Sequence, residues 1–93
     1  MVNAIKTTDY CVLFNQGKVT TGDSVYAIEK ILVRKKGTTE IRFAYYKKDS
    51  NGKENFVPRP LDLEEEHLVS LLKEGIKSEV ISKEMLQKVI DES

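Results

Sequence analysis

The clearest alternation of hydrophobic and polar positions in this chain lies within residues 31–60. Ile31 and Val33 share one face of a predicted strand, and a polar turn follows at residues 36–39. Side chains that alternate in this way line opposite faces of a β-strand. The segment therefore predicts a three-stranded antiparallel meander.

The middle strand of this meander, expected over residues 40–46, sets its faces. The side chains predicted to face the core are Ile41, Phe43 and Tyr45, and those predicted to face outward are Glu40, Arg42, Ala44 and Tyr46. Asn51-Gly52 predicts a two-residue type I′ turn, because both of its positions need positive φ. A third strand is expected over residues 54–57.

Residues 9–20 fit two kinds of element. Their apolar run favours a strand that turns at Gly17 and returns over residues 18–20. A helix capped by Thr8 or Asp9 and ending at Gly17 is the alternative. We expect the strand.

Residues 23–30 also fit either a strand or a short helix. We expect a strand that leads into the meander. In a strand the adjacent Glu29 and Lys30 point to opposite faces, which places one charge inward unless the strand lies at an edge.

The period becomes helical after the connector Pro58-Arg59-Pro60. Asp62 is the predicted start of the first helix, with Glu65 in capping-box position, and Gly75 is its predicted left-handed stop. Ser82 is the predicted cap of the second helix, with Ser78 as the alternative. The apolar stripes of both helices are expected to be buried on the meander: Leu68, Leu71, Leu72, Met85, Leu86, Val89 and Ile90.

These elements predict one α+β domain over residues 1–93, strand-rich over residues 1–60 and helical over residues 61–93. Its antiparallel meander has three to five strands, and two C-terminal helices pack on one face. A chain of 93 residues has room for one core. We therefore do not expect an enclosed active site in addition.

The charge is unevenly distributed, although the whole chain is neutral. Residues 1–60 carry 11 Lys and Arg against 6 Asp and Glu, and residues 61–93 carry 4 against 9. Basic side chains and a tyrosine are expected to gather on the outer face of the meander, where arginines grip phosphates and tyrosines stack on bases. This predicted partner or nucleic-acid face comprises Arg34, Lys36, Arg42, Tyr46, Lys47, Lys48 and Arg59. The alternative is that these side chains only solvate the sheet and protect its edge.

The reactive side chains are too few for the common catalytic sites. Cys11 and His67 are the only cysteine and histidine, and the glycines do not form a phosphate-binding loop. We expect Cys11 to be buried and His67 to lie at the edge of the core. No enzymatic activity, cofactor or metal is expected.

The sequence also bears on location. No apolar run is long enough to span a membrane, the first six residues lack the apolar core of a signal peptide, and a lone cysteine fits a reducing compartment. We therefore expect a cytoplasmic protein. The excess of lysine over arginine points loosely to a bacterial or phage genome.

The resulting hypothesis is a small non-enzymatic interaction or regulatory protein that binds a protein partner or associates with itself as a homodimer. Nucleic-acid binding through the basic face is the first alternative. A small enzyme is the second.

Overall fold

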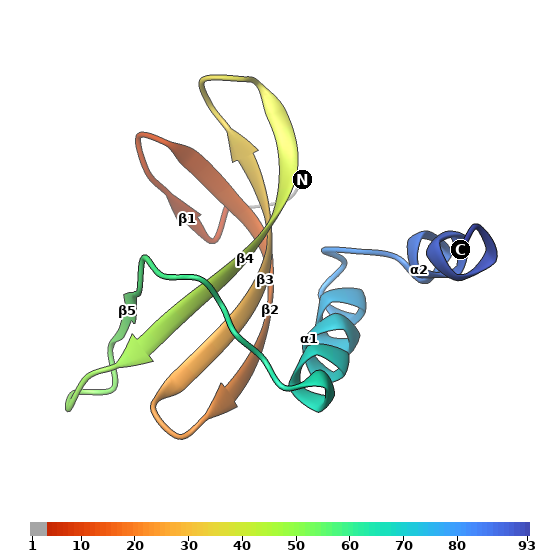
Figure 1. Cartoon of the computed structure of the whole chain (residues 1–93). Helices are drawn as coiled ribbons and strands as arrows, with labels where there is room; N and C mark the ends of the chain where they lie inside the picture. Colours follow the sequence, from red (N-terminus) through yellow and green to blue (C-terminus); the bar gives the residue numbers. More distant parts are fainter. Residues whose placement is uncertain (1–3) are drawn as a thin grey trace.

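Five antiparallel strands form a single sheet in the computed structural model, which describes residues 4–93 (Figure 1). The signal-peptide prediction concerned residues 1–3 in part, and these lie outside the described range. Each strand pairs with the next along the chain, so the sheet is a meander. The strands are β1 (Lys6–Thr7), β2 (Cys11–Thr21), β3 (Ser24–Val33), β4 (Thr38–Lys48) and β5 (Glu54–Phe56). The predicted α+β class is confirmed.

Two helices follow the sheet, α1 (Glu65–Lys77) and α2 (Lys83–Asp91). Helix α1 packs across β2 and β3, where buried Leu71 contacts Ile28 in the core. Helix α2 projects away from the sheet and contains no buried residue (Figure 1). The prediction that both helices pack on the sheet is therefore correct for α1 and wrong for α2.

The sheet is curved, with β1 and β5 bending toward each other on the side away from α1 (Figure 1). Lys18 of β2 and Glu54 of β5 form an ion pair of 2.9 Å, although two strands separate them in the sheet. We call this side the concave face and the side that carries α1 the helix face. Two apolar clusters lie on the concave face: Cys11 with Leu13, Ile31 and Val33, and Val25 with Ala27, Ala44 and Tyr46.

Strand β2 confirms the strand predicted over residues 9–20 and excludes the helical alternative. The predicted position of its turn is wrong, however. Gly17 lies inside the strand, in register with Ile28, and the chain turns at Gly22, whose φ is 63°. Gly17 is needed there because the backbone of α1 passes directly over it.

Strand β3 confirms the strand predicted over residues 23–30, and it also settles which charge points inward. Glu29 is fully buried on the concave face, whereas Lys30 is half-buried on the helix face. Ala27 and Ile31, two positions before and after Glu29 in the strand, are buried on the same side as Glu29. The inward charge predicted from adjacent Glu and Lys is thus a glutamate in the middle of the sheet.

Strand β4 forms as predicted, but its two faces are assigned wrongly. Ile41 and Phe43, predicted to be core residues, are 46% and 50% exposed, whereas Tyr46, predicted to face outward, is 8% exposed. The reason is that α1 covers β2 and β3 and leaves the helix face of β4 open. The curvature of the sheet encloses the opposite set instead, including Ala44.

The turn between β4 and β5 also differs from the predicted type I′ turn. Only Gly52 has positive φ, at 80°, and Asn51 does not. The Asp49 carboxylate instead accepts hydrogen bonds from the amides of Asn51 and Lys53. A side chain therefore provides part of the turn geometry that the dipeptide was expected to provide.

The ends of the helices correct two further predictions. Helix α1 begins after Glu64 without a side-chain cap, so the capping box at Asp62 and Glu65 does not form. It continues through Gly75 and ends in a Schellman arrangement, in which Val80 donates to the Gly75 carbonyl. Glu79, with φ of 63°, occupies the left-handed position predicted for Gly75.

The start of α2 agrees with the prediction. The Ser82 hydroxyl accepts a hydrogen bond from the Met85 amide at 3.1 Å, which is a normal N-cap contact. Ser78, the alternative cap, instead ends α1.

Candidate functional site

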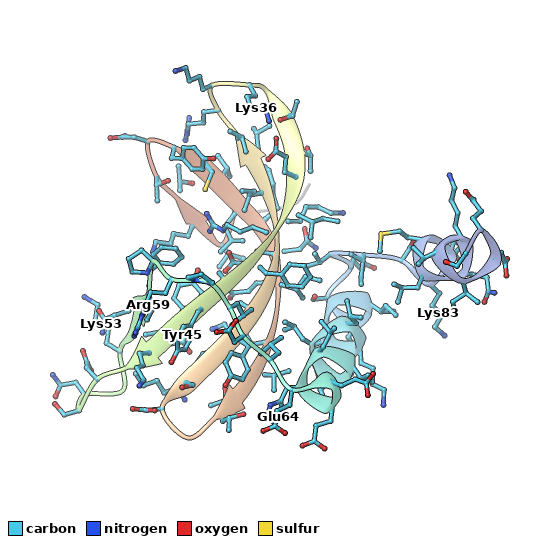
Figure 2. All side chains as sticks on the ribbon, in the orientation of Figure 1. Lys36, Tyr45, Lys53, Arg59, Glu64 and Lys83 are labelled. Atoms are coloured by element: carbon cyan, nitrogen blue, oxygen red, sulfur yellow. The ribbon has the colours of Figure 1, made fainter. Side chains whose placement is uncertain are left out.

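The seven side chains predicted to form one basic face lie in separate places. Arg34 and Lys36 lie in the turn between β3 and β4, at one end of the sheet. Lys47 and Lys48 lie at the far end of β4, and Arg59 lies in the connector before α1. Figure 2 shows Lys36 and Arg59 well apart along the sheet. Arg42 and Tyr46 point into the concave face. The structure does not bring the seven together.

Three of these basic side chains already have partners within the chain. Arg34 donates from Nε to the Thr8 carbonyl at 2.9 Å. Lys36 donates from Nζ to the Glu40 carboxylate at 2.7 Å, and this contact raises the pKa of Lys36 and lowers that of Glu40. Arg42 is bound to Glu29.

Glu29 is the centre of a buried polar layer on the concave face. Its Oε1 accepts from Arg42 Nε at 2.9 Å and lies 2.8 Å from Arg42 Nη2. Its Oε2 accepts from Tyr46 Oη and from Gln16 Nε2, both at 2.7 Å. Gln16 and Arg42 lie directly across from Glu29 on β2 and β4, so the meander itself places the donors. The layer separates the two apolar clusters.

This layer has the properties of a structural element. Three hydrogen bonds and the ion-pair contact of Arg42 Nη2 occupy both oxygens of Glu29. No buried side-chain nitrogen or oxygen in residues 4–93 lacks a hydrogen-bond partner. The hollow beside Arg42 and Cys11 has a volume of about 160 Å³. Ligand pockets usually have roughly 300–1,000 Å³. The carboxylate is therefore committed to hydrogen bonds inside the protein.

Alkaline pH should destabilise the fold through Tyr46. Burial, together with the hydrogen bond to Glu29, raises the pKa of Tyr46 far above its ordinary value of 10.0. Because the folded state favours the protonated phenol, this contribution is fully present below about pH 10 and is lost as the pH rises further. Urea unfolding of the wild type and Tyr46→Phe should show their stability difference shrinking above about pH 10, by at most roughly 1.4 kcal/mol per pH unit. A constant difference up to about pH 11 would contradict this expectation.

A different feature is the outer edge of β4, where part of the backbone has no strand partner. The Tyr45 carbonyl accepts a hydrogen bond from the Val57 amide at 2.8 Å, so the backbone of Tyr45 points away from β3. Backbone groups in an antiparallel strand alternate in direction. Those of Thr39, Ile41 and Phe43 therefore also point to the outer side. Strand β5 pairs only with residues 46–48, and no hydrogen bond within residues 4–93 reaches this side of residues 39–43.

Apolar side chains accompany these unpaired backbone groups. Ile41 and Phe43 stand half-exposed on the helix face of the same segment. We define the β4 edge surface as the outward backbone of Thr39, Ile41 and Phe43 with the side chains of Ile41 and Phe43. A groove of about 600 Å³ runs from Ile41 to Met85, between β4 and the start of α2.

Helix α2 extends the exposed apolar surface beyond this groove. Met85, Val89 and Ile90 are 38%, 58% and 68% exposed, and only Leu86 of the predicted stripe packs against the core. A helix whose apolar stripe faces solvent is unusual in an isolated domain. The groove and the helix together leave a large exposed apolar surface on this side of the molecule.

No family model, curated protein or solved structure matches this chain. Inferences about function therefore rest on the residues and the structure of this chain alone.

Two further observations limit the chemistry. In residues 4–93, no group of three or more His, Cys, Asp or Glu side chains is arranged to hold a metal ion. None of the helices in this range is long and apolar enough to cross a membrane.

The sequence reasoning missed both Glu29 as a centre of hydrogen bonding and the β4 edge surface. The adjacent Glu29 and Lys30 were the signal for the first, since a strand must turn one of them inward. For the second the signal was weak. The shortness of the third predicted strand, four residues beside a seven-residue neighbour, implied that part of the middle strand had no outer partner.

Proposed function

We propose that this protein is a non-enzymatic interaction module that binds an extended protein segment along the β4 edge surface. The observation that carries the proposal is the row of outward backbone groups at Thr39, Ile41 and Phe43, next to two half-exposed apolar side chains. Strand addition of this kind draws affinity from backbone hydrogen bonds and specificity from alternate side chains.

The β4 edge surface has few of the features that normally protect a sheet edge. Natural edges are kept short, are covered by a loop, or carry proline, a bulge or charged side chains. Residues 39–43 contain no proline and pair regularly with β3. Both of their charged side chains already have partners within the chain, and residues 59–63 of the connector lie beside Phe43. Ile41 and Phe43 remain half-exposed, and an edge of this kind favours aggregation unless a partner covers it. Binding is therefore a better explanation for it than solvation.

The remaining features support a binding role over a catalytic one. The buried carboxylate of Glu29 has both oxygens engaged by neighbours, and the hollow beside it is small. The basic residues predicted to form a nucleic-acid face have less support, because they lie at opposite ends of the sheet or inside it. Nucleic-acid binding therefore stays a secondary proposal.

Selection of linear peptides from a seven-residue display library on the wild-type protein tests the proposal. Proline at position 41 removes only an outward N–H, because the Ile41 amide is not part of the ladder with β3. We expect Ile41→Pro to bind the selected peptides about tenfold more weakly than the wild type. Ile41→Thr, which keeps the N–H and the strand propensity, is the matched control and should lose less affinity.

Hydrogen exchange provides a second measurement that needs no variant. Added peptide should slow exchange of the amides of Thr39, Ile41 and Phe43, whereas the amides of Arg42 and Ala44, already bonded to β3, should change little. Uniform protection along β4, or peptides that bind Ile41→Pro as well as the wild type, would remove the β4 edge surface from the proposed function.

A further inference from the structure

We propose that the natural occupant of the β4 edge surface is a second copy of this chain, paired antiparallel through β4 with Ile41 opposite the partner's Ile41. This inference rests on the proposed function and deepens it by naming the partner. Two antiparallel edge strands related by a two-fold axis form an isologous contact, the commonest kind in homodimers. The two meanders would then form one continuous sheet.

The length of the free edge selects the centre of this pairing. Along β4, the outward backbone groups without a partner in residues 4–93 belong to Thr39, Ile41 and Phe43. A pairing centred on Ile41 places Thr39 opposite the partner's Phe43, and Phe43 opposite the partner's Thr39. Every outward residue then meets an outward residue, which provides about six backbone hydrogen bonds. Beyond residue 43 the edge is occupied, since Val57 binds Tyr45.

The charges of β4 select the same register independently. Glu40 and Arg42 lie on the concave side of the strand, next to Ile41 on either side. In the pairing centred on Ile41, each Glu40 lies directly opposite the partner's Arg42, so opposite charges face each other twice. These contacts would add to those that Glu40 makes with Lys36 and Arg42 makes with Glu29. The axis can also pass through residue 42 or residue 40, and outward backbone groups would still face outward ones. The first shift places Arg42 opposite the partner's Arg42, and the second places Glu40 opposite the partner's Glu40. Like charges directly opposite destabilise a strand pair.

The apolar side chains fit this arrangement too. On the helix face, Ile41 would cover the partner's Ile41, and each Phe43 would lie across from a threonine. β-Branched and aromatic pairs of this kind stabilise antiparallel strands. The groove between Ile41 and Met85 lies on the same side, which brings the exposed Met85 of α2 near the new contact.

Sedimentation of the full chain over a range of concentrations tests for the dimer. We expect a reversible monomer–dimer equilibrium that Glu40→Lys weakens about tenfold, because two attractive pairs become repulsive. Lys36→Ala is the matched control. It removes the internal partner of Glu40, held at 2.7 Å, but changes neither charge opposite the partner's strand. Its dimer affinity should stay within about twofold of the wild type.

Cysteine substitutions test the register. Under oxidised glutathione, Ile41→Cys should form a disulfide-linked dimer with itself. Thr39→Cys and Phe43→Cys should each fail alone but cross-link when mixed, because these positions face each other only in this register. The cysteine already present, Cys11, is buried and serves as the background in the wild type. A self-cross-link at position 40 or 42 in place of 41 would overturn the register.

The outcomes separate this inference from the proposed function. A wild-type chain that stays monomeric to about millimolar concentration, yet binds selected peptides at the alternating amides of β4, overturns the homodimer and leaves strand addition in place. A dimer that tolerates Glu40→Lys and Ile41→Pro without loss of affinity overturns the homodimer through β4. A chain that neither dimerises nor binds peptides at these amides overturns both.

Discussion

Glu29→Gln should lower the free energy of unfolding by about 3 kcal/mol, the largest effect that we expect from any single polar substitution. The glutamine keeps the shape of the side chain but leaves the Arg42 guanidinium without its counter-charge. In the wild type, Tyr46 Oη, Gln16 Nε2 and the guanidinium all donate to a carboxylate, which only accepts. The glutamine replaces one of its oxygens by an NH₂ group, which is itself a donor. Removing one partner of a buried pair leaves the other uncompensated.

We place this value at the lower end of the usual range, roughly 3–5 kcal/mol, because the Arg42 side chain is 30% exposed and keeps some water. A loss of this size is a large fraction of the stability of a small domain, about 5–15 kcal/mol. Urea or thermal unfolding followed by circular dichroism would measure it.

Glu54→Gln provides the matched control for this prediction. Glu54 also forms a 2.9 Å ion pair, with Lys18, but its side chain is 30% exposed and that of Lys18 is 39% exposed. Exposed pairs contribute about 0–1 kcal/mol, so the control should change stability little. Equal effects of the two substitutions would show that the polar layer around Glu29 does not stabilise the fold more than a surface ion pair does.

A double substitution separates the charge from the packing. Glu29→Leu together with Arg42→Met replaces the buried pair by apolar side chains of similar size. Such replacements are often neutral or even stabilising, whereas single changes are costly. We expect the double variant to be more stable than Glu29→Gln, although Tyr46 and Gln16 lose their acceptor.

Gly17→Ala should destabilise the protein by about 2 kcal/mol, although alanine is normally the better residue in a strand. A Cβ atom at this position would lie 2.6 Å from the carbonyl oxygen of Glu74 and 3.0 Å from the amide nitrogen of Gly75. Both atoms belong to the backbone of α1, which cannot move aside as a flexible side chain can. The helix would have to move off the sheet.

The cost of this substitution would come from packing alone, because Gly17 has no positive φ. Gly52→Ala is the contrasting control, since Gly52 has φ of 80° and a Cβ atom added there would meet nothing within 4 Å. It should lose about 1 kcal/mol through its own backbone and leave α1 in place. Hydrogen exchange within α1 distinguishes the two, because only Gly17→Ala should accelerate it. An increase in stability on Gly17→Ala would contradict the close approach.

The alternation of the sequence determined that strands form, and where most of them lie. Strands β2 (Cys11–Thr21) and β3 (Ser24–Val33) lie where residues 9–20 and 23–30 were expected to be extended, although β2 is one strand rather than two that turn at Gly17. The meander over residues 31–57 is also present. The short-range cap at Ser82 was also evident from the chain. These features depend on contacts between neighbours in sequence, so a local pattern contains the information needed.

Which face of each strand is buried was decided by the tertiary structure. A period of two divides β4 into one set with Ile41 and Phe43 and another with Arg42 and Tyr46, but it does not state which set is covered. Because the first set is the more hydrophobic, the sequence favoured it as the buried face. The path of α1 over β2 and β3, permitted by Gly17, left that set exposed, and the curvature of the sheet enclosed the second around Glu29.

The candidate surface follows from the same cause. The sequence could indicate a strand with apolar side chains, but an unpaired edge exists only because β5 ends before it reaches residues 39–43. The predicted basic face does not form as one surface for a related reason. The Arg42 side chain points inward to the carboxylate of Glu29, which lies on the neighbouring strand and 13 positions away in the chain. Local propensity determined the elements of this protein, and long-range packing decided which of their side chains meet solvent, because burial depends on contacts that no local window contains.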